Sequence, residues 1–179
     1  MSKTIQINAY NSITGVTERK TISKFSWIFD KDLTNAYEIE LLTLLTNDIH
    51  VRNESKENDM KVLRREISRK IDGYKYQDVA KELYDETKFV DFSYVCNLLI
   101  NTNCACYYCK QPVKCLYQKV RDSLQWTLDR IDNDYGHNKE NVYICCLKCN
   151  ITRKVKHHEN YKVAKQMKVV KIGHEVEDI

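Results

Sequence analysis

Proline and glycine are scarce in this chain of 179 residues, which contains one proline and four glycines. Such a content excludes collagen-like repeats and argues against long low-complexity linkers. Long apolar runs are also missing, since no stretch approaches the roughly 18–20 apolar residues that a membrane helix needs. The first residues, Met1–Asn8, lack the apolar core of a secretion signal. We therefore expect an intracellular protein of the cytoplasm or nucleus that is not secreted and has no membrane partner.

The rest of the composition is typical of a soluble, folded protein. Hydrophobic residues make up 42% of the chain and charged residues 30%, and the length fits one domain with an extension. The net charge of +4 is unevenly distributed. Residues 104–156 contain ten lysines and arginines against five acidic residues, a local charge of +5. This excess favours a polyanionic partner, most simply nucleic acid.

Eight cysteines are many for a chain that we expect to remain inside the cell. In a reducing compartment they act as metal ligands or free thiols rather than disulfides. Two Cys-x-x-Cys pairs, Cys106/Cys109 and Cys146/Cys149, each place two sulfurs on one tight turn, and four thiolates satisfy a tetrahedral zinc ion. The 36 residues between the pairs can form a hairpin whose ends return to the metal. We therefore predict a structural zinc site.

Neighbouring residues leave alternatives for single ligands. Cys104 or Cys145 could replace an adjacent cysteine, although the x-x spacing fits a knuckle turn better. His157 and His158 follow closely enough to be ligands as well. With four cysteines available, we favour surface or nucleic-acid contact for both histidines.

The segment between the cysteine pairs has the pattern of a β-hairpin. Residues 125–132 are strand-like, and the sequence Asp-Asn-Asp-Tyr-Gly at 132–136 is a strong turn signal. A second strand is expected at 141–145. From Cys149 onward the chain is basic and contains no helix breaker, which predicts a helix. The order strand, loop, strand, helix is a ββα unit.

Upstream of the cysteines the pattern is mainly helical. β-branched and aromatic residues at 4–29 indicate short strands. A helix follows in which Asn35 and Glu38 are placed like a capping box. The next helix has a basic outer face and is expected to stop at Gly73, and Asp91 is expected to cap another.

We therefore predict an α+β protein with a mainly helical N-terminal part and a small zinc-stabilised ββα module. The expected division has four parts: an N-terminal extension of short strands and helices at 1–75, a helical segment packed on the module at 76–103, the zinc-bound module at 104–158, and a C-terminal helix or tail at 159–179.

Several motifs follow one another in this module. Leu128-Asp-Arg-Ile-Asp-Asn is followed by Gly136-His, Asn141-Val, and Cys146-x-x-Cys-Asn-x-x-Arg153. This series resembles the HNH endonuclease family, and more narrowly its zinc-bound members in large DNA viruses and phages. A weaker likeness extends upstream through Gly73–Asp78. The resemblance implies a ββα-metal fold and metal-dependent hydrolysis of DNA phosphodiesters that leaves 5′-phosphate and 3′-hydroxyl ends.

The resemblance also implies roles for three residues. Asp129, at the end of the first strand, would be a ligand of a catalytic Mg²⁺ or Mn²⁺ ion. Asn150, on the first turn of the helix, would be the second ligand. Asn141 would pin the loop between the strands. A carboxylate and an amide oxygen leave several positions of a hard ion open for water and phosphate.

The sequence departs from the family pattern at the general base, because Arg130 stands where the family usually has histidine. A guanidinium group cannot accept a proton near neutral pH, although it can bind phosphate. His137, in the expected loop, is the best substitute, and its alternative role is to order the turn or bind phosphate. Asp132 is a weaker candidate that more often makes a turn.

Basic residues after the zinc pair, Arg153, Lys154 and Lys156, are expected to lie with Arg130 against the phosphates of double-stranded DNA. The alternative to an endonuclease is a non-catalytic zinc-containing DNA-binding module derived from an HNH nuclease. Loss of the usual base at Arg130 is the feature that favours this alternative.

Overall fold

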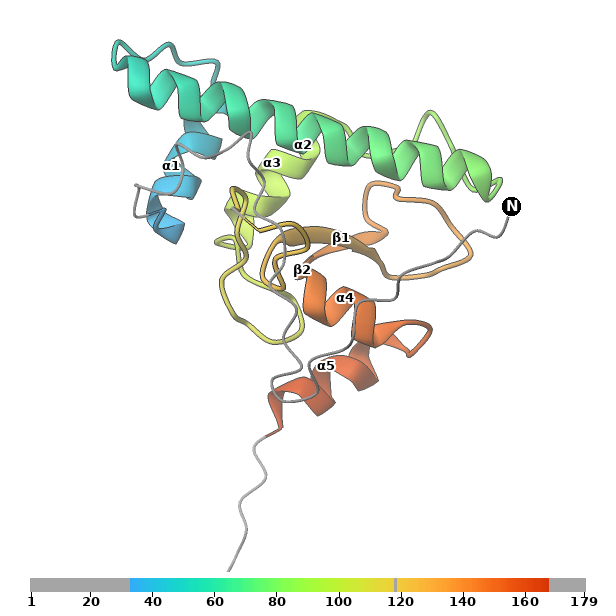
Figure 1. Ribbon diagram of the computed structural model, residues 1–179. Helices are drawn as coiled ribbons and strands as arrows, with labels where there is room; N and C mark the ends of the chain where they lie inside the picture. Colours follow the sequence, from blue (N-terminus) through green and yellow to red (C-terminus); the bar gives the residue numbers. More distant parts are fainter. Residues whose placement is uncertain (1–32, 118, 168–179) are drawn as a thin grey trace, which may run out of the picture.

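The computed structural model describes residues 33–117 and 119–167 and has mixed α+β architecture (Figure 1). Within these residues the chain forms five helices and one two-stranded antiparallel sheet, which confirms the expected α+β class. The elements in order are α1 (Asn35–Thr46), α2 (Glu54–Ala80), α3 (Phe92–Asn101), β1 (Trp126–Arg130), β2 (Val142–Cys146), α4 (Leu147–Arg153) and α5 (His158–Gln166). The strands expected at 4–29 lie outside the described residues.

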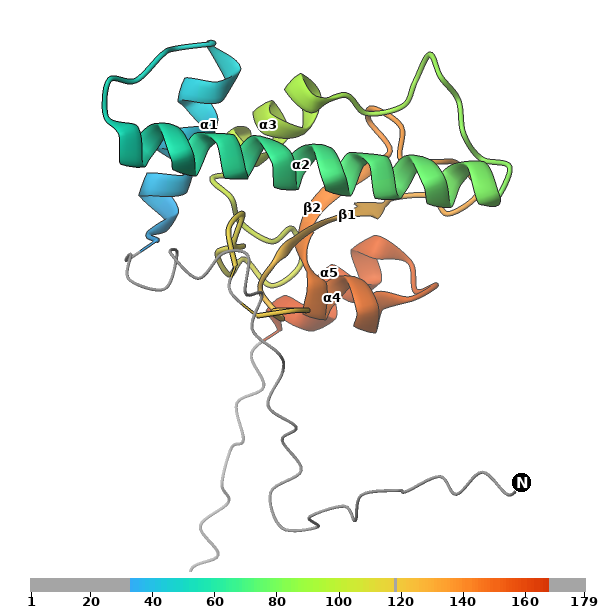
Figure 2. The ribbon, with the colours of Figure 1, turned by 45° about the horizontal axis from the view of Figure 1, so that its top comes forward.

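Helix α2 crosses the whole molecule, as Figures 1 and 2 show. It starts after Asn53, whose side chain accepts a hydrogen bond from the amide of Lys56 at 3.0 Å. The predicted stop at Gly73 is wrong, because α2 continues to Ala80. A mid-helix glycine costs only about 1 kcal/mol relative to alanine, less than the gain from burying α2 side chains such as Leu63. The division expected at residue 75 therefore falls inside one helix.

The N-cap of helix α1 lies one residue earlier than predicted. Thr34 is the N-cap, and its hydroxyl accepts a hydrogen bond from the amide of Tyr37 at 3.2 Å. Glu38 is buried and takes no part in a capping box. Its carboxylate accepts hydrogen bonds from the amides of Cys115 and Leu116, at 2.7–3.1 Å. Glu38 therefore joins α1 to the loop that precedes the hairpin.

The strand, loop, strand, helix order is confirmed over residues 126–153. The register pairs Trp126 with Cys146 at one end of the hairpin and Arg130 with Val142 at the other. Helix α4 follows β2 without a linker and packs on both strands. Asp91 caps α3, as predicted, by accepting a hydrogen bond from the amide of Tyr94 at 2.7 Å.

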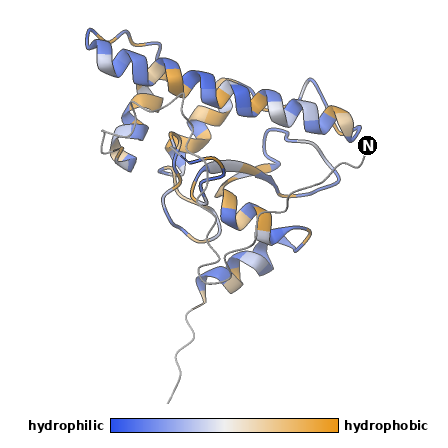
Figure 3. Ribbon diagram, viewed as in Figure 1, coloured by the Kyte–Doolittle hydropathy of each residue, from blue (hydrophilic) through white to orange (hydrophobic). Residues whose placement is uncertain are grey.

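One hydrophobic core connects the helices with the hairpin. In Figure 3, α2 is largely hydrophilic with hydrophobic positions at intervals. The buried cluster includes Leu41 of α1, Leu63 of α2, Leu99 of α3, Trp126 of β1 and Ile144 of β2. The helical part therefore packs directly on the module. None of the helices in the described ranges combines the length and apolar character needed to cross a membrane.

Candidate zinc centre and adjoining polar site

Four cysteine sulfurs gather at one end of the hairpin. The Sγ atoms of Cys106, Cys109, Cys146 and Cys149 all lie within 4.8 Å of one another, and those of Cys109 and Cys146 are 3.9 Å apart. A tetrahedral zinc ion with Zn–S bonds of about 2.3 Å separates its sulfur ligands by roughly 3.8 Å. The cluster therefore could hold a zinc ion, in agreement with the spacing of the two pairs.

Two local structures bring these sulfurs together. The first pair lies on a tight turn in which Lys110 adopts a left-handed conformation (φ 60°) and its amide donates to the carbonyl of Cys106 at 3.0 Å. The amide of Tyr107 donates to the carbonyl of Ile144 at 2.8 Å, which ties this turn to β2. The second pair starts α4: Cys146 is its N-cap, and its sulfur accepts a hydrogen bond from the amide of Cys149 at 3.4 Å. The start of α4 is therefore part of the candidate zinc site.

The other cysteines and histidines considered as zinc ligands lie outside the four-sulfur cluster. The sulfur of Cys104 is 3.9 Å from that of Cys115 in the core, and the sulfur of Cys145 is 3.2 Å from the Thr127 hydroxyl. His157 and His158 stack on each other at the start of α5, with ring centroids 4.6 Å apart. None of these side chains belongs to the four-sulfur group.

Asp129 is buried beside α4, with only 6% of its surface exposed. Its Oδ2 accepts a hydrogen bond from the hydroxyl of Tyr108 at 2.5 Å, and its Oδ1 accepts one from Nη1 of Arg153 at 2.8 Å. Burial raises the pKa of the Asp129 carboxyl above its ordinary value, while both partners oppose this rise. Each carboxylate oxygen keeps a second lone pair beyond these bonds.

Asn150 faces the same strand from α4. Its amide nitrogen donates to the carbonyl of Leu128 at 3.0 Å and to the hydroxyl of Thr127 at 3.1 Å. The amide oxygen is then the end of this side chain left to accept or to coordinate. Asp129 directly follows Leu128, so a carboxylate and an amide oxygen lie on the α4 side of β1. These donors match a hard divalent cation in kind.

The structure places Arg153 differently from the expected position against DNA. Only 2% of this residue is exposed, and its guanidinium is inserted between Asp129 and the carbonyl of Ile131, 3.2 Å from Nη2. A buried carboxylate needs a cationic or hydrogen-bonding partner, and Arg153 supplies it from the last turn of α4. Lys154 and Lys156 are exposed, so a nucleic acid could reach both.

The loop between the strands is held by two of the expected residues. The Asn141 side chain accepts from the amide of Asp132 and donates to the carbonyls of Asp132 and Gly136, each at 3.0 Å. Asn141 thus bridges the two ends of the loop. Arg130 donates from Nη1 to the carbonyls of Asn133 and Tyr135, at 3.1 and 3.0 Å. The Arg130 guanidinium is therefore partly engaged inside the loop.

His137 is buried and bound to a residue from the far end of α2. Its Nδ1 lies 2.8 Å from Oδ1 of Asp78, and its backbone amide donates to Oδ2 of Asp78 at 2.6 Å. The ring of Tyr74 stacks on the imidazole at 4.4 Å, and the Tyr74 hydroxyl accepts a hydrogen bond from the amide of Leu128 on β1. Burial lowers the pKa of His137, although the Asp78 carboxylate opposes this effect. Burial thus favours the neutral form of the imidazole.

Sequence reasoning missed Asp78 and Tyr74 as partners of His137. Both belong to the stretch Gly73–Asp78, where the weaker likeness to the HNH family lies. If the helix had ended at Gly73, as predicted, Tyr74 and Asp78 would not have belonged to α2. The unbroken helix instead carries Asp78 to the loop, where Gly136 allows close contact: a Cβ there would lie 2.8 Å from Oδ2 of Asp78.

Comparisons with known proteins found no matching family model, no matching curated protein and no matching solved structure. The geometry of the chain itself therefore carries the functional argument. That geometry comprises a four-cysteine cluster able to bind zinc and a polar site beside it built from Asp129, Asn150 and Arg153.

Proposed function

We propose that this protein is a metal-dependent endonuclease of the HNH type that hydrolyses DNA phosphodiester bonds. One observation carries the proposal. Adjacent residues of α4 serve two sites: Cys149 belongs to the sulfur cluster, while Asn150 is hydrogen-bonded to β1 beside Asp129. A zinc ion that fixes Cys149 would thereby fix the position of Asn150, as a structural metal beside a catalytic site does.

Asp129 and Asn150 are the residues that would hold a catalytic Mg²⁺ or Mn²⁺ ion. Such an ion stabilises negative charge on the phosphate and on the departing 3′-oxygen. Tyr108 and Arg153 orient the Asp129 carboxylate through one hydrogen bond to each oxygen. Arg153 also brings a positive charge next to the carboxylate, which limits the cost of burying it.

His137 is the proposed general base. With Nδ1 bonded to the Asp78 carboxylate, the proton of the neutral ring resides on Nδ1 and Nε2 is the basic nitrogen. The lowered pKa favours the unprotonated form of this nitrogen, as a general base requires. In the proposed reaction Nε2 takes a proton from the attacking water, whose oxygen bonds to phosphorus as the P–O3′ bond breaks. The departing 3′-oxygen takes a proton from solvent, so the products carry 5′-phosphate and 3′-hydroxyl ends.

A second function, a non-catalytic zinc-containing DNA-binding module, is favoured by the ion pair between Asp129 and Arg153. In this reading the guanidinium neutralises the carboxylate permanently, at 2.8 Å, and no divalent ion binds. Arg130, in place of the usual histidine, fits the same reading. DNA would then bind to the exposed basic residues and would not be cleaved.

A plasmid-nicking assay distinguishes the two functions. Zinc-loaded protein is incubated with supercoiled plasmid and Mg²⁺ or Mn²⁺, and wild type is compared with Asp129→Asn. The amide can still hydrogen-bond to Tyr108 and Arg153, but the buried guanidinium loses its counter-charge, so melting temperature and zinc content verify that the variant is folded. The folded variant should lose about 100-fold or more in nicking rate. Asp134→Asn, an exposed change in the adjoining loop, is the matched control and should nick like wild type.

Three outcomes decide the question. Nicking by wild type that is lost in Asp129→Asn supports the endonuclease. Nicking that survives in Asp129→Asn overturns the assignment of the metal ligand. A wild-type protein that shifts DNA in a gel but does not nick it with either ion supports the binding module.

A further inference from the structure

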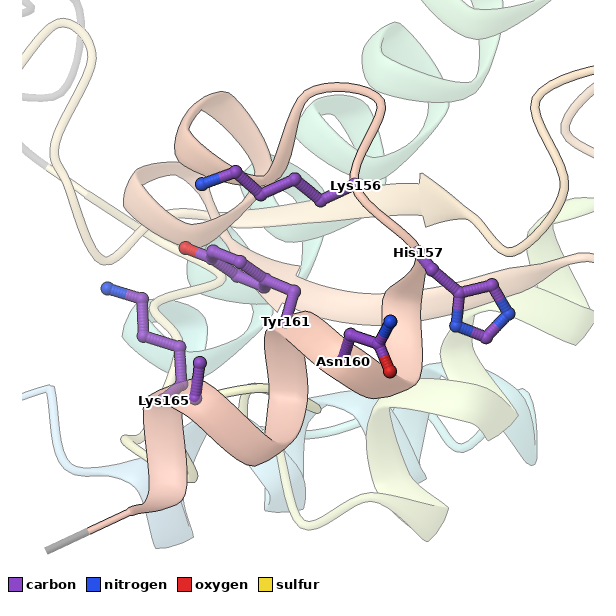
Figure 4. Close-up of a pocket in the computed structure, with 6 residues that line it drawn as sticks. Lys156, His157, Asn160, Tyr161 and Lys165 are labelled. Atoms are coloured by element: carbon purple, nitrogen blue, oxygen red, sulfur yellow. The ribbon is translucent and has the colours of Figure 1, made fainter.

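A pocket of about 500 Å³ lies along α5, outside the polar site described above (Figure 4). It is lined by Lys156, His157, Asn160, Tyr161, Ala164 and Lys165. The lining contains two lysines, one histidine and one amide, and it contains no acidic residue. Its chemistry is therefore that of an anion site.

The two lysines converge on one aromatic ring. In Figure 4 the side chains of Lys156, Tyr161 and Lys165 end on the same side of the pocket, whereas His157 points away from them. The ammonium groups of Lys156 and Lys165 lie 6.0 and 5.5 Å from the centre of the Tyr161 ring. Within the described parts of the chain, no carboxylate lies within ion-pair distance of either group. Two positive charges thus flank the Tyr161 ring, and neither has a carboxylate partner among the described residues.

The acidic residue of α5 faces another direction. Glu159 pairs with Lys162 at 3.4 Å and accepts a hydrogen bond from the hydroxyl of Tyr107. Lys162 in turn donates to Tyr107 at 3.1 Å. The charges on that face of α5 are therefore internally balanced, and those in the pocket are available to an external anion.

The pocket is also close to Asp129. The Tyr161 ring packs edge-on against Tyr108, with centroids 5.0 Å apart, and the Tyr108 hydroxyl binds Asp129. These two tyrosines thus connect the lining of the α5 pocket to the proposed catalytic carboxylate.

From this arrangement we infer that the α5 pocket binds a backbone phosphate of the DNA substrate, held by Lys156 and Lys165 with the amide of Asn160. The inference rests on the proposed function and adds Asn160 and Lys165 to its substrate contacts. The pocket anchors the strand at a phosphate other than the one being cleaved. Backbone contacts of this kind do not depend on sequence.

The test measures DNA binding as a function of salt concentration. Full-length, zinc-loaded protein is titrated with 20-bp duplexes of two unrelated sequences, without Mg²⁺ or Mn²⁺. The double variant Lys156→Gln, Lys165→Gln should bind both duplexes more weakly, and the slope of log K against log salt should become shallower by about 1 to 2. Lys156→Arg, Lys165→Arg keeps both charges and should retain the wild-type slope.

The matched control removes two lysine charges from the other side of the molecule. Lys61 lies on α2 in an ion pair with Glu57, and Lys56, near the start of the same helix, pairs with Glu40. The double variant Lys56→Gln, Lys61→Gln should keep the wild-type slope. Melting temperature and zinc content verify that each variant is folded.

Each result has one meaning. A shallower slope in the α5 variant alone supports the inference, even if wild type fails to nick DNA and the proposed function falls. An unchanged slope overturns the inference, and nicking by the same variant at the wild-type rate leaves the proposed function standing. Loss of binding to phosphatidylserine vesicles, with unchanged DNA binding, would assign the pocket to a lipid headgroup and also overturn it.

Discussion

The carboxylate of Asp78 binds His137 at two points, since Oδ1 meets Nδ1 of the ring at 2.8 Å and Oδ2 accepts the backbone amide at 2.6 Å. Both residues are buried, and 59 positions separate them in the sequence. This pair joins the far end of α2 to the loop between the strands. It also determines which ring nitrogen of His137 can act as a base.

Replacing Asp78 by asparagine tests both consequences. Asp78→Asn removes the charge that orients the imidazole, so we expect a loss of about 2 kcal/mol in the free energy of unfolding and a marked fall in the nicking rate. Urea unfolding and the plasmid assay measure the two effects. Asp85→Asn, a more exposed change nearby in the chain, is the control. Nicking at the wild-type rate in Asp78→Asn would show that His137 does not act through this pair.

Zinc binding should depend on Cys146 and not on its neighbour Cys145. The sulfur of Cys146 belongs to the cluster, whereas that of Cys145 lies against Thr127. Cys146→Ala should therefore lose the zinc ion and much of the stability of the module, because a structural metal contributes folding free energy directly. Metal analysis of purified protein should find one zinc ion per chain in wild type and in Cys145→Ala. Retention of zinc by Cys146→Ala would refute the ligand set.

Gly73 offers a stabilising substitution. It lies within α2, and a Cβ added there would meet nothing within 4 Å. Because alanine restricts the unfolded chain and favours a helix, Gly73→Ala should increase the free energy of unfolding by about 0.5–1 kcal/mol. Thermal unfolding gives the comparison. A decrease would mean that α2 does not continue through this position.

Glu38 should make stability depend on pH. Burial raises the pKa of its carboxyl to about 7, against the opposing effect of hydrogen bonds from Leu116 and Cys115. The folded state then holds a proton that the unfolded state has already released, so this contribution is complete below about pH 4.5 and is lost as the pH rises through 7. Relative to Glu38→Gln, wild type should thus become less stable between pH 5 and pH 8. Parallel urea curves at several pH values measure the difference, and a constant difference would contradict the prediction.

The local features of the module were predictable because neighbouring residues determine them. Strand-like residues on both sides of the turn at 132–136, and the absence of a breaker after Cys149, sufficed for the hairpin and for α4. The cysteine pairs were recognisable because zinc knuckles require that spacing. The length of α2 was not predictable, since the penalty at Gly73 is small beside the burial of side chains such as Leu63 and Ile67.

The sequence by itself determined the four cysteines that could bind zinc, the ββα order and the α+β class, since each depends on residue type and on spacing over a few turns. Only the tertiary structure decided what the polar residues contact. Arg153 is on Asp129 instead of an outer surface, His137 is bound to Asp78, and Lys165 shares a pocket with Lys156. The physical reason is that a buried charge must find a partner, and packing of distant elements chooses which one.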